Sequence, residues 1–184
     1  VNYFDSSDLT AYDSARRSKN VKIIFAVDNQ GRLTEAGKNV LGLINPNALL
    51  ISRTVKLSDE QYDALPGIDL TINDFGVINE HLTRKQVLNS RLHRILARNP
   101  NEVPAEFAED ANLLPAYVSD IFRLGKSRHK YDEMMGIYPD THEQSAKLRA
   151  WYVSRLEDMS DVDGGYGLDD DYGRFVGLAP EAQV

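Results

Sequence analysis

The sequence predicts an α+β protein that is mainly helical, with a small N-terminal sheet, a packed helical C-terminal half and extended polar arms at both termini. A β-branched and aromatic run, Val21 to Val27, stops at Asp28 and Asn29, as a buried strand does at a turn. Three Ser or Thr residues are each followed three positions later by Gln, which is the spacing of a helix-starting capping box. Neither end of the chain has sustained hydrophobic periodicity.

Composition indicates one soluble domain without thiol chemistry. Among 184 residues, 42% are hydrophobic, 27% are charged and none is Cys. This length and apolar content suit a single core, so we expect an arm over residues 1–20, one domain over residues 21–159 and an acidic tail over residues 160–184. No apolar run reaches the ~18 residues of a membrane-spanning helix, and no secretory leader is visible. We therefore expect a cytoplasmic location, or incorporation in an intracellularly assembled particle.

The first half is expected to alternate short strands with short helices. Thr34 is a candidate N-cap, and Ser58 with Gln61 forms the first capping-box pair, so a helix should start at each place. The elements expected in order are a strand over 21–27, a helix over 34–43, a strand over 48–55, a helix from 58 that stops before Pro66, and an edge strand over 68–72.

The second half is expected to be helical throughout. Thr83 with Gln86, and Thr141 with Gln144, form two further capping-box pairs. The expected helices are 83–98, 104–114, 116–124, 127–135 and 141–159. The last of them has one apolar face, formed by Leu148, Trp151, Tyr152, Leu156 and Met159.

Opposite charges are concentrated in two segments of a chain whose net charge is -7. Residues 81–101 contain no acid and five basic residues, which are Arg84, Lys85, Arg91, Arg94 and Arg98. Residues 157–173 contain seven acids and no base. Because the whole chain is acidic, binding to nucleic acid or to an anionic membrane would have to be local.

The basic residues are expected to form a stripe on one side of the helix over 83–98. At 100° per residue, Arg84, Arg91 and Arg98 repeat every seven positions, and Arg94 falls near them. Such a stripe suits phosphates or an acidic partner, since guanidinium groups match planar anions. The alternative is a solvated basic face balanced by nearby carboxylates, which is the usual role of a charge run.

Aromatic residues mark both terminal arms. The N-terminal arm contains Tyr3, Phe4 and Tyr12. The tail mixes acids with aromatics, and its candidate contact residues are Asp163, Tyr166, Asp169, Asp170, Asp171, Tyr172 and Phe175. We expect this tail to dock on the basic stripe of its own or another subunit; the alternative is that it only maintains solubility, because diffuse attraction is screened by salt.

No catalytic, cofactor or metal motif is recognisable, so we expect no enzymatic activity, no cofactor and no metal site. His129 and Glu133 stand one turn apart on an expected helix, but two ligands do not make a metal site. Ser127 and Lys130 have the Ser-x-x-Lys spacing of some acyl-transfer enzymes, although helix capping by Ser127 explains it better.

These features favour a non-enzymatic structural or assembly protein, a subunit of a larger multisubunit particle such as a viral one. Its partners would be copies of itself or other subunits, reached through the terminal arms, with no role for a membrane. The alternative is a regulator that binds nucleic acid or an acidic partner through the helix over 83–98, with the tail as competitor. A hydrolase with an unrecognised site is a more remote alternative.

Overall fold

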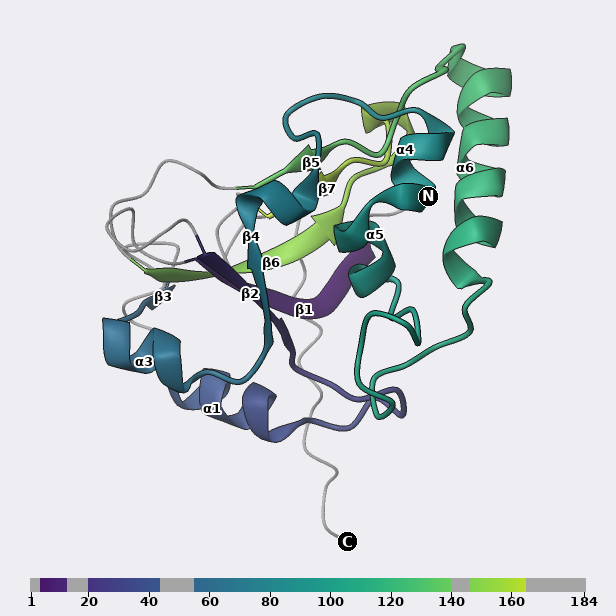
Figure 1. Cartoon of the computed structure of the whole chain (residues 1–184). Coiled ribbons are helices and arrows are strands. Elements are labelled where there is room, and N and C mark those ends of the chain that lie inside the picture. Colours follow the sequence, from purple (N-terminus) through teal and green to yellow (C-terminus); the bar gives the residue numbers. More distant parts are fainter. Residues whose placement is uncertain (1–3, 13–19, 44–54, 140–145, 165–184) are drawn as a thin grey trace, which may run out of the picture.

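A mixed sheet of seven strands forms the centre of the molecule in the computed structural model, which describes residues 4–12, 20–43, 55–139 and 146–164 (Figure 1). The strand order is β4-β2-β1-β6-β7-β5, and β3 also pairs with β6. All pairs are antiparallel except β5 with β7. The strands are β1 (Phe4–Tyr12), β2 (Asn20–Phe25), β3 (Val55–Lys56), β4 (Ile68–Thr71), β5 (Ile137–Tyr138), β6 (Lys147–Val153) and β7 (Val162–Asp163).

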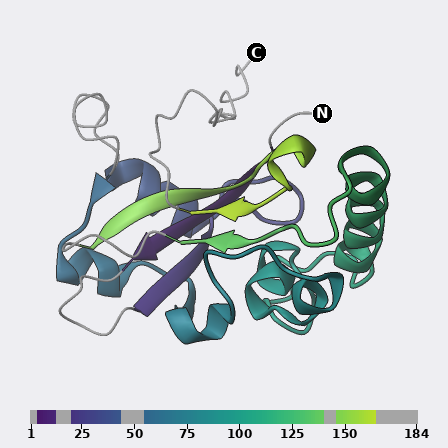
Figure 2. The same cartoon turned by 90° about the horizontal axis from the view of Figure 1, so that it is seen from above.

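Helices cover both faces of the sheet (Figure 2). Two helices pack on one face, and they are α1 (Glu35–Leu43) and α3 (Asp59–Ala64). The other face is covered by α4 (Arg84–Asn89), α5 (Arg91–Leu96) and α6 (Leu113–His129), together with the 3-10 turns η1 (Ile72–Phe75) and η2 (Leu156–Asp158). In the part of the chain that the structure describes, none of the helices has the length and apolar character needed to cross a membrane.

The sheet separates a larger core under α4, α5 and α6 from a smaller core under α1 and α3. Successive side chains of a strand point to opposite faces, so one strand can serve both cores. In β2, Ile23 lies in the larger core and Ile24 in the smaller one, and both are fully buried. In β6, Trp151 lies in the larger core and Leu148 in the smaller one. Both strands are therefore central to the packing of the whole domain.

The prediction of a mainly helical fold with a small N-terminal sheet is wrong. The second half supplies three strands, and β6 replaces the helix predicted over 141–159. This strand has β1 along one edge, and β3 and β7 along the other. The spacing of Leu148 and Trp151 fits one helical face, but it also puts them on opposite faces of a strand, where both are buried. The capping-box pair Thr141 and Gln144 lies outside the described residues.

The prediction of an extended N-terminal arm is wrong for residues 4–12, which form β1 between β2 and β6. Phe4 and Tyr12 are thus the two ends of a central strand, while Tyr3 lies outside the described residues. The register of β1 with β6 shifts between Asp5 and Leu9, and this irregularity removes the clean alternation by which a sequence reveals a strand. At the other end, residues 162–163 of the expected tail form β7.

Several short-range predictions are confirmed in the first half of the chain. The strand over 21–27 is β2 with a following turn, and the expected edge strand is β4, which ends the sheet. Thr34 caps α1, since its Oγ1 accepts a hydrogen bond from Gly37 N at 2.9 Å. Ser58 and Gln61 form the reciprocal capping box of α3, with bonds of 3.2 and 2.7 Å. Of the strand expected over 48–55, only its last residue is described, in β3.

The helices predicted between residues 104 and 135 are wrong in their boundaries. Residues 104–112 form turns, and α6 then runs without interruption through Gly125. This glycine is not a helix end: it is buried, and a Cβ there would overlap the sulfur of Met134. The helix stops instead at Lys130, whose backbone is left-handed with φ 65°. Gly125 therefore serves the close approach of α6 to the segment that follows it.

Candidate functional site

The basic helix predicted over 83–98 is two helices that meet at Ser90. Thr83 and Gln86 form the expected capping box, with Thr83 N donating to Gln86 Oε1 at 2.8 Å. Ser90 then has an extended backbone, with ψ 124°, and its Oγ accepts from His93 N at 3.4 Å. Because Ser90 ends α4 and begins α5, the rotation of 100° per residue does not continue through it. The predicted stripe of four guanidinium groups is therefore not formed.

Two of the predicted binding residues, Arg91 and Arg94, are neutralised within the chain. Both reach Glu102, which lies in the turns after α5: Arg94 Nη2 is 2.7 Å and Arg91 Nε 3.3 Å from its carboxylate. Arg91 Nη1 also lies 3.3 Å from Asp74 Oδ1, and Arg94 Nη1 donates to Asn89 O at 2.7 Å. These ion pairs tie α5 to η1 and to the following turns. The sequence reading misses Glu102, because only the turns bring it back to α5.

Arg98 has a third environment, against an aromatic pair. Its guanidinium carbon lies 5.3 Å from the ring centre of Phe25, and Phe25 stacks on Phe107 with ring centres 4.8 Å apart. Arg98 also has a positive φ of 54°, and its carbonyl oxygen accepts from Glu109 N at 2.8 Å. A guanidinium over an aromatic face stabilises the folded chain by ~0.5–1 kcal/mol or more. Arg98 is accordingly a structural residue of the turns between α5 and α6.

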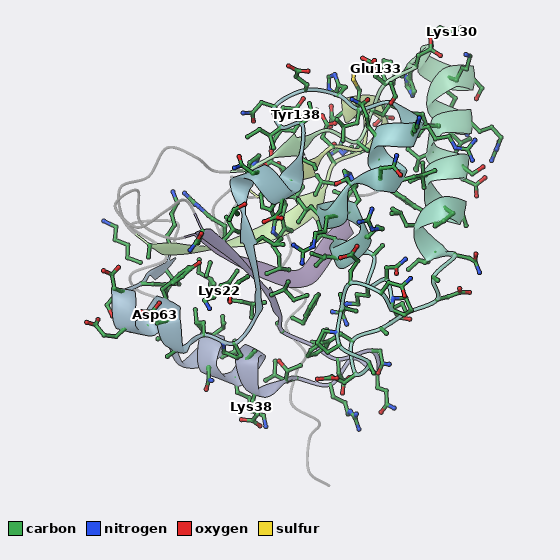
Figure 3. The ribbon with its side chains drawn as sticks, in the orientation of Figure 1. Lys22, Lys38, Asp63, Lys130, Glu133 and Tyr138 are labelled. Atoms are coloured by element: carbon green, nitrogen blue, oxygen red, sulfur yellow. The ribbon has the colours of Figure 1, made fainter. Side chains whose placement is uncertain are left out.

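The remaining predicted residues, Arg84 and Lys85, are exposed at the start of α4. Leu82 pairs with Met134 just beyond the end of α6, so this start lies near the residues that follow α6, as Figure 3 shows around Lys130. Two more exposed cations belong to that end of the molecule, Arg128 and Lys130. We call these four residues the basic patch. Among the described residues none of the four has an ion-pair partner, whereas Lys126 beside them is bound to Asp132 at 2.8 Å.

A second constellation joins His81 to Asp161 across the strand β5. His81 Nε2 lies 3.3 Å from Asp161 Oδ2, and Gly136 N donates to Asp161 Oδ1 at 2.7 Å. Gly136 lies between them, and a Cβ at this position would collide with the carbonyl oxygen of Glu80. The absence of a side chain at Gly136 is therefore what permits the segment before α4 to approach β5. We call His81, Gly136 and Asp161 the clamp.

The clamp is surrounded by groups that titrate. Burial raises the pKa of Asp161 above its ordinary value, and the Gly136 amide and His81 offset part of that rise. Burial and the carboxylates of Asp161, Asp163 and Glu80 raise the pKa of Tyr138, whose ring meets that of His81 edge-on at 6.2 Å. A carboxylate–imidazole pair can support acid–base chemistry, but in the described part of the chain no hydroxyl is hydrogen-bonded to His81. The clamp therefore has a structural role: Asp161 joins the segment before α4, at His81, to the segment before β5, at Gly136.

The clamp gives a testable prediction. Asp161→Ala is expected to lower the free energy of unfolding by about 1–3 kcal/mol, because it leaves the Gly136 amide without its acceptor. Asp161→Asn keeps an acceptor oxygen and should cost less. Because the folded pKa of Asp161 is raised, the native state binds the extra proton, and stability falls as pH rises from the unfolded value through the folded one. Urea titrations across that range should show this pH dependence in the wild type and its loss in the Asn variant; an equal loss of stability in both variants would contradict the assignment.

His93 is buried on α5, in contact with the larger core. Its residue is 3% exposed, and neither ring nitrogen has a hydrogen-bond partner with good geometry in the described structure. Burial lowers the pKa of His93 from 6.5 to about 4, and the nearby backbone of Met135 offsets a small part of this shift. The imidazole is therefore an uncharged core side chain at neutral pH. Because the unfolded chain binds a proton that this buried ring excludes, His93 makes the fold sensitive to acid.

The other sequence candidates are not brought together. His129 ends α6 and stacks on Tyr131, while Glu133 lies beyond the helix, so the expected one-turn spacing is lost. Ser127 lies inside α6 and donates to Leu124 O at 3.1 Å instead of capping a new helix. Within the described ranges, no three His, Cys, Asp or Glu side chains gather as a metal site. Asp163 lies in β7, while Tyr166, Asp169, Asp170, Asp171, Tyr172 and Phe175 lie outside the described residues.

Comparison with known proteins identifies the architecture. No protein-family model matches the chain, and no curated protein matches it significantly in sequence. The structure is similar to a solved structure described as showing how the C-type lectin fold accommodates massive sequence variation in Nanoarchaeota. The similarity has a TM-score of 0.51 at 10% identity and covers 90% of this chain and 71% of that one. The chain has a C-type lectin-like fold. At this identity the similarity concerns the fold alone.

Proposed function

We propose that this protein is a non-enzymatic subunit of a larger assembly and that it binds neighbouring subunits through charged surfaces. The observation that carries the proposal is the concentration of unpaired charge where α4 begins and α6 ends. The basic patch lies there, and exposed carboxylates border it: Glu80 precedes α4, and the backbone of Glu157 accepts from Tyr131 Oη at 3.1 Å. Charges arranged in this way favour contacts with a complementary surface of another chain.

The arrangement of the arginines supports protein partners over nucleic acid. A nucleic-acid surface needs several cations free to neutralise phosphates. Of the five residues predicted to form the stripe, Arg91 and Arg94 are already paired with carboxylates, and Arg98 lies against Phe25. Of those five, Arg84 and Lys85 remain for the nucleic-acid alternative; Arg128 and Lys130 of the basic patch join them, but Glu80 and Glu157 border the patch on a chain of net charge -7. It stays the weaker proposal.

Mass measurement by light scattering tests the proposed function. At low salt we expect a mass that is a defined multiple of the 20.7 kDa chain, because complementary charges attract most strongly there. At about 0.5 M salt, screening beyond a few ångströms should shift the mass towards one chain. A chain that stays monomeric at low salt and at high concentration would remove the proposal. Lys38→Glu on α1, on the opposite face of the sheet from α4, is the control and should not change the mass.

Removal of residues 165–184 gives an independent prediction about the same assembly. The segment removed follows the last described strand, β7, so the circular dichroism spectrum and the unfolding curve of the shortened chain serve as the control for its fold. The segment removed contains Asp169, Asp170 and Asp171 among aromatic residues, so we expect a smaller oligomer or a steeper loss of mass with salt. An unchanged mass at every salt concentration would show that the tail makes no subunit contact.

A further inference from the structure

Two helices of this chain form a matched pair with opposite charges. Both α3 and α4 have six residues, and both begin with a reciprocal capping box closed by Gln at the third helical position. The first two helical residues are Asp59 and Glu60 in α3, but Arg84 and Lys85 in α4. The local backbone chemistry is the same in the two helices. The two helices thus share their capping and differ in the sign of the charge in their first turn.

The charges of α4 are opposite to those that helix stability favours. The N-terminal end of a helix carries partial positive charge, so carboxylates stabilise it and cations destabilise it. The first turn of α4 contains no acid, and Arg84 and Lys85 have no ion-pair partner in the described ranges. Of the two carboxylates that follow α6, Asp132 is already bound by Lys126, and exposed Glu133 forms no ion pair with either cation in the described ranges. The stability of α4 does not explain why two cations stand there.

The two cations are part of a larger basic surface. Leu82 and Met134 exchange backbone hydrogen bonds of 3.0 and 2.9 Å, which brings the start of α4 close to the segment after α6. Lys130, at the end of α6, adds an exposed cation (Figure 3), and Arg128, in the last turn of α6, adds another. The capping box of α4 already occupies the backbone amides of Thr83 and Gln86, so this surface is defined by its side-chain cations. Any ligand here is recognised by the four side chains.

We propose that the basic patch is the docking surface for a short acidic polypeptide segment, and that residues 166–177 of a second copy have the required chemistry. This inference rests on the proposed function, since it names the partner of the assembly surface. Residues 166–177 contain three consecutive aspartates between Tyr166 and Tyr172. The four cations of the basic patch complement the charge of these three aspartates. The exposed carboxylates Glu80 and Glu157, which border the patch, would repel a continuous phosphate backbone.

The test exchanges the first turns of the matched helices in the full-length protein. In Arg84→Asp/Lys85→Glu, α4 receives the charges of α3, so the melting temperature should stay equal or rise by ~1–4 °C. Binding of a fluorescent peptide with the sequence of residues 166–177, measured by anisotropy, should weaken at least ~10-fold. The control Asp59→Arg/Glu60→Lys makes the reverse change in α3; it should lower the melting temperature and leave peptide binding intact.

Other results would overturn either the docking surface or the proposed assembly. Unchanged peptide affinity in Arg84→Asp/Lys85→Glu would exclude the patch, and a lower melting temperature in that variant would show that the cations serve the fold. Equal binding of a peptide with Asp169, Asp170 and Asp171 replaced by Asn would exclude charge recognition. A DNA oligonucleotide that binds when the peptide does not would select the nucleic-acid alternative. A monomeric protein that binds the peptide would contradict the proposed assembly and keep the patch, whereas an oligomer indifferent to the exchange would do the opposite.

Discussion

Removal of residues 1–12 is expected to abolish cooperative folding. These residues contain β1, which pairs with β2 from Asp8 to Tyr12 and with β6 along most of its length. Without β1 the sheet divides into two parts, β4-β2 and β6-β7-β5 with β3 still paired to β6, and each part gains an unpaired edge. We expect the stabilising free energy lost with β1 to exceed the free energy of unfolding of an ordinary domain, which is about 5–15 kcal/mol. Circular dichroism and a thermal scan should show a chain without a cooperative transition.

This deletion separates the observed fold from an extended arm, which could be removed without unfolding the domain. Ala11→Asp tests the same strand with one substitution, because Ala11 is fully buried in the smaller core and an unpaired carboxylate there is costly. Removal of residues 165–184 is the control, since the described sheet does not include them. If residues 13–184 unfold cooperatively at the wild-type temperature, the central position of β1 is incorrect.

Acid is expected to destabilise the protein through His93. The folded pKa is lowered to about 4 from 6.5, so the unfolded chain binds a proton that the native core excludes. Stability is therefore highest above the unfolded pKa, and it falls as pH decreases towards the folded pKa. At 1.36 kcal/mol per unit, this one residue accounts for a loss of up to about 3 kcal/mol across that window. Urea denaturation of the wild type between pH 7 and pH 4 measures the loss.

His93→Leu isolates this contribution, because it keeps a core side chain of similar volume without a titrating group. The difference in the free energy of unfolding between variant and wild type should grow as pH falls from about 6.5 to about 4 and then level off. His129→Leu, at the half-exposed end of α6, is the matched control. A difference between His93→Leu and wild type that does not change with pH would show that the pKa of His93 is the same in the folded and unfolded states, against the lowered value expected from its burial.

The sequence was sufficient where structure depends on neighbouring residues. Ser58 with Gln61, and Thr83 with Gln86, start helices because their hydrogen bonds close within four residues, whatever surrounds them. Ser90 shows the limit of this reasoning. Its apolar neighbours keep a helical period from 83 to 98, yet its hydroxyl caps a new helix and turns Arg91 and Arg94 towards Glu102. Packing decides whether such a residue continues one helix or starts another.

By itself, the sequence determined the helix starts with capping boxes, the strand β2, the edge strand β4 and the position of the basic residues in the chain. Tertiary structure alone decided that the segments containing β1 and β6 are strands, because each has its backbone hydrogen bonds completed by partners distant in the sequence. Tertiary structure also decided which cations stay unpaired, since Glu102 reaches Arg91 and Arg94 and leaves Arg84 and Lys85 exposed. Charge in a sequence is local, whereas its neutralisation depends on which residues the fold brings together.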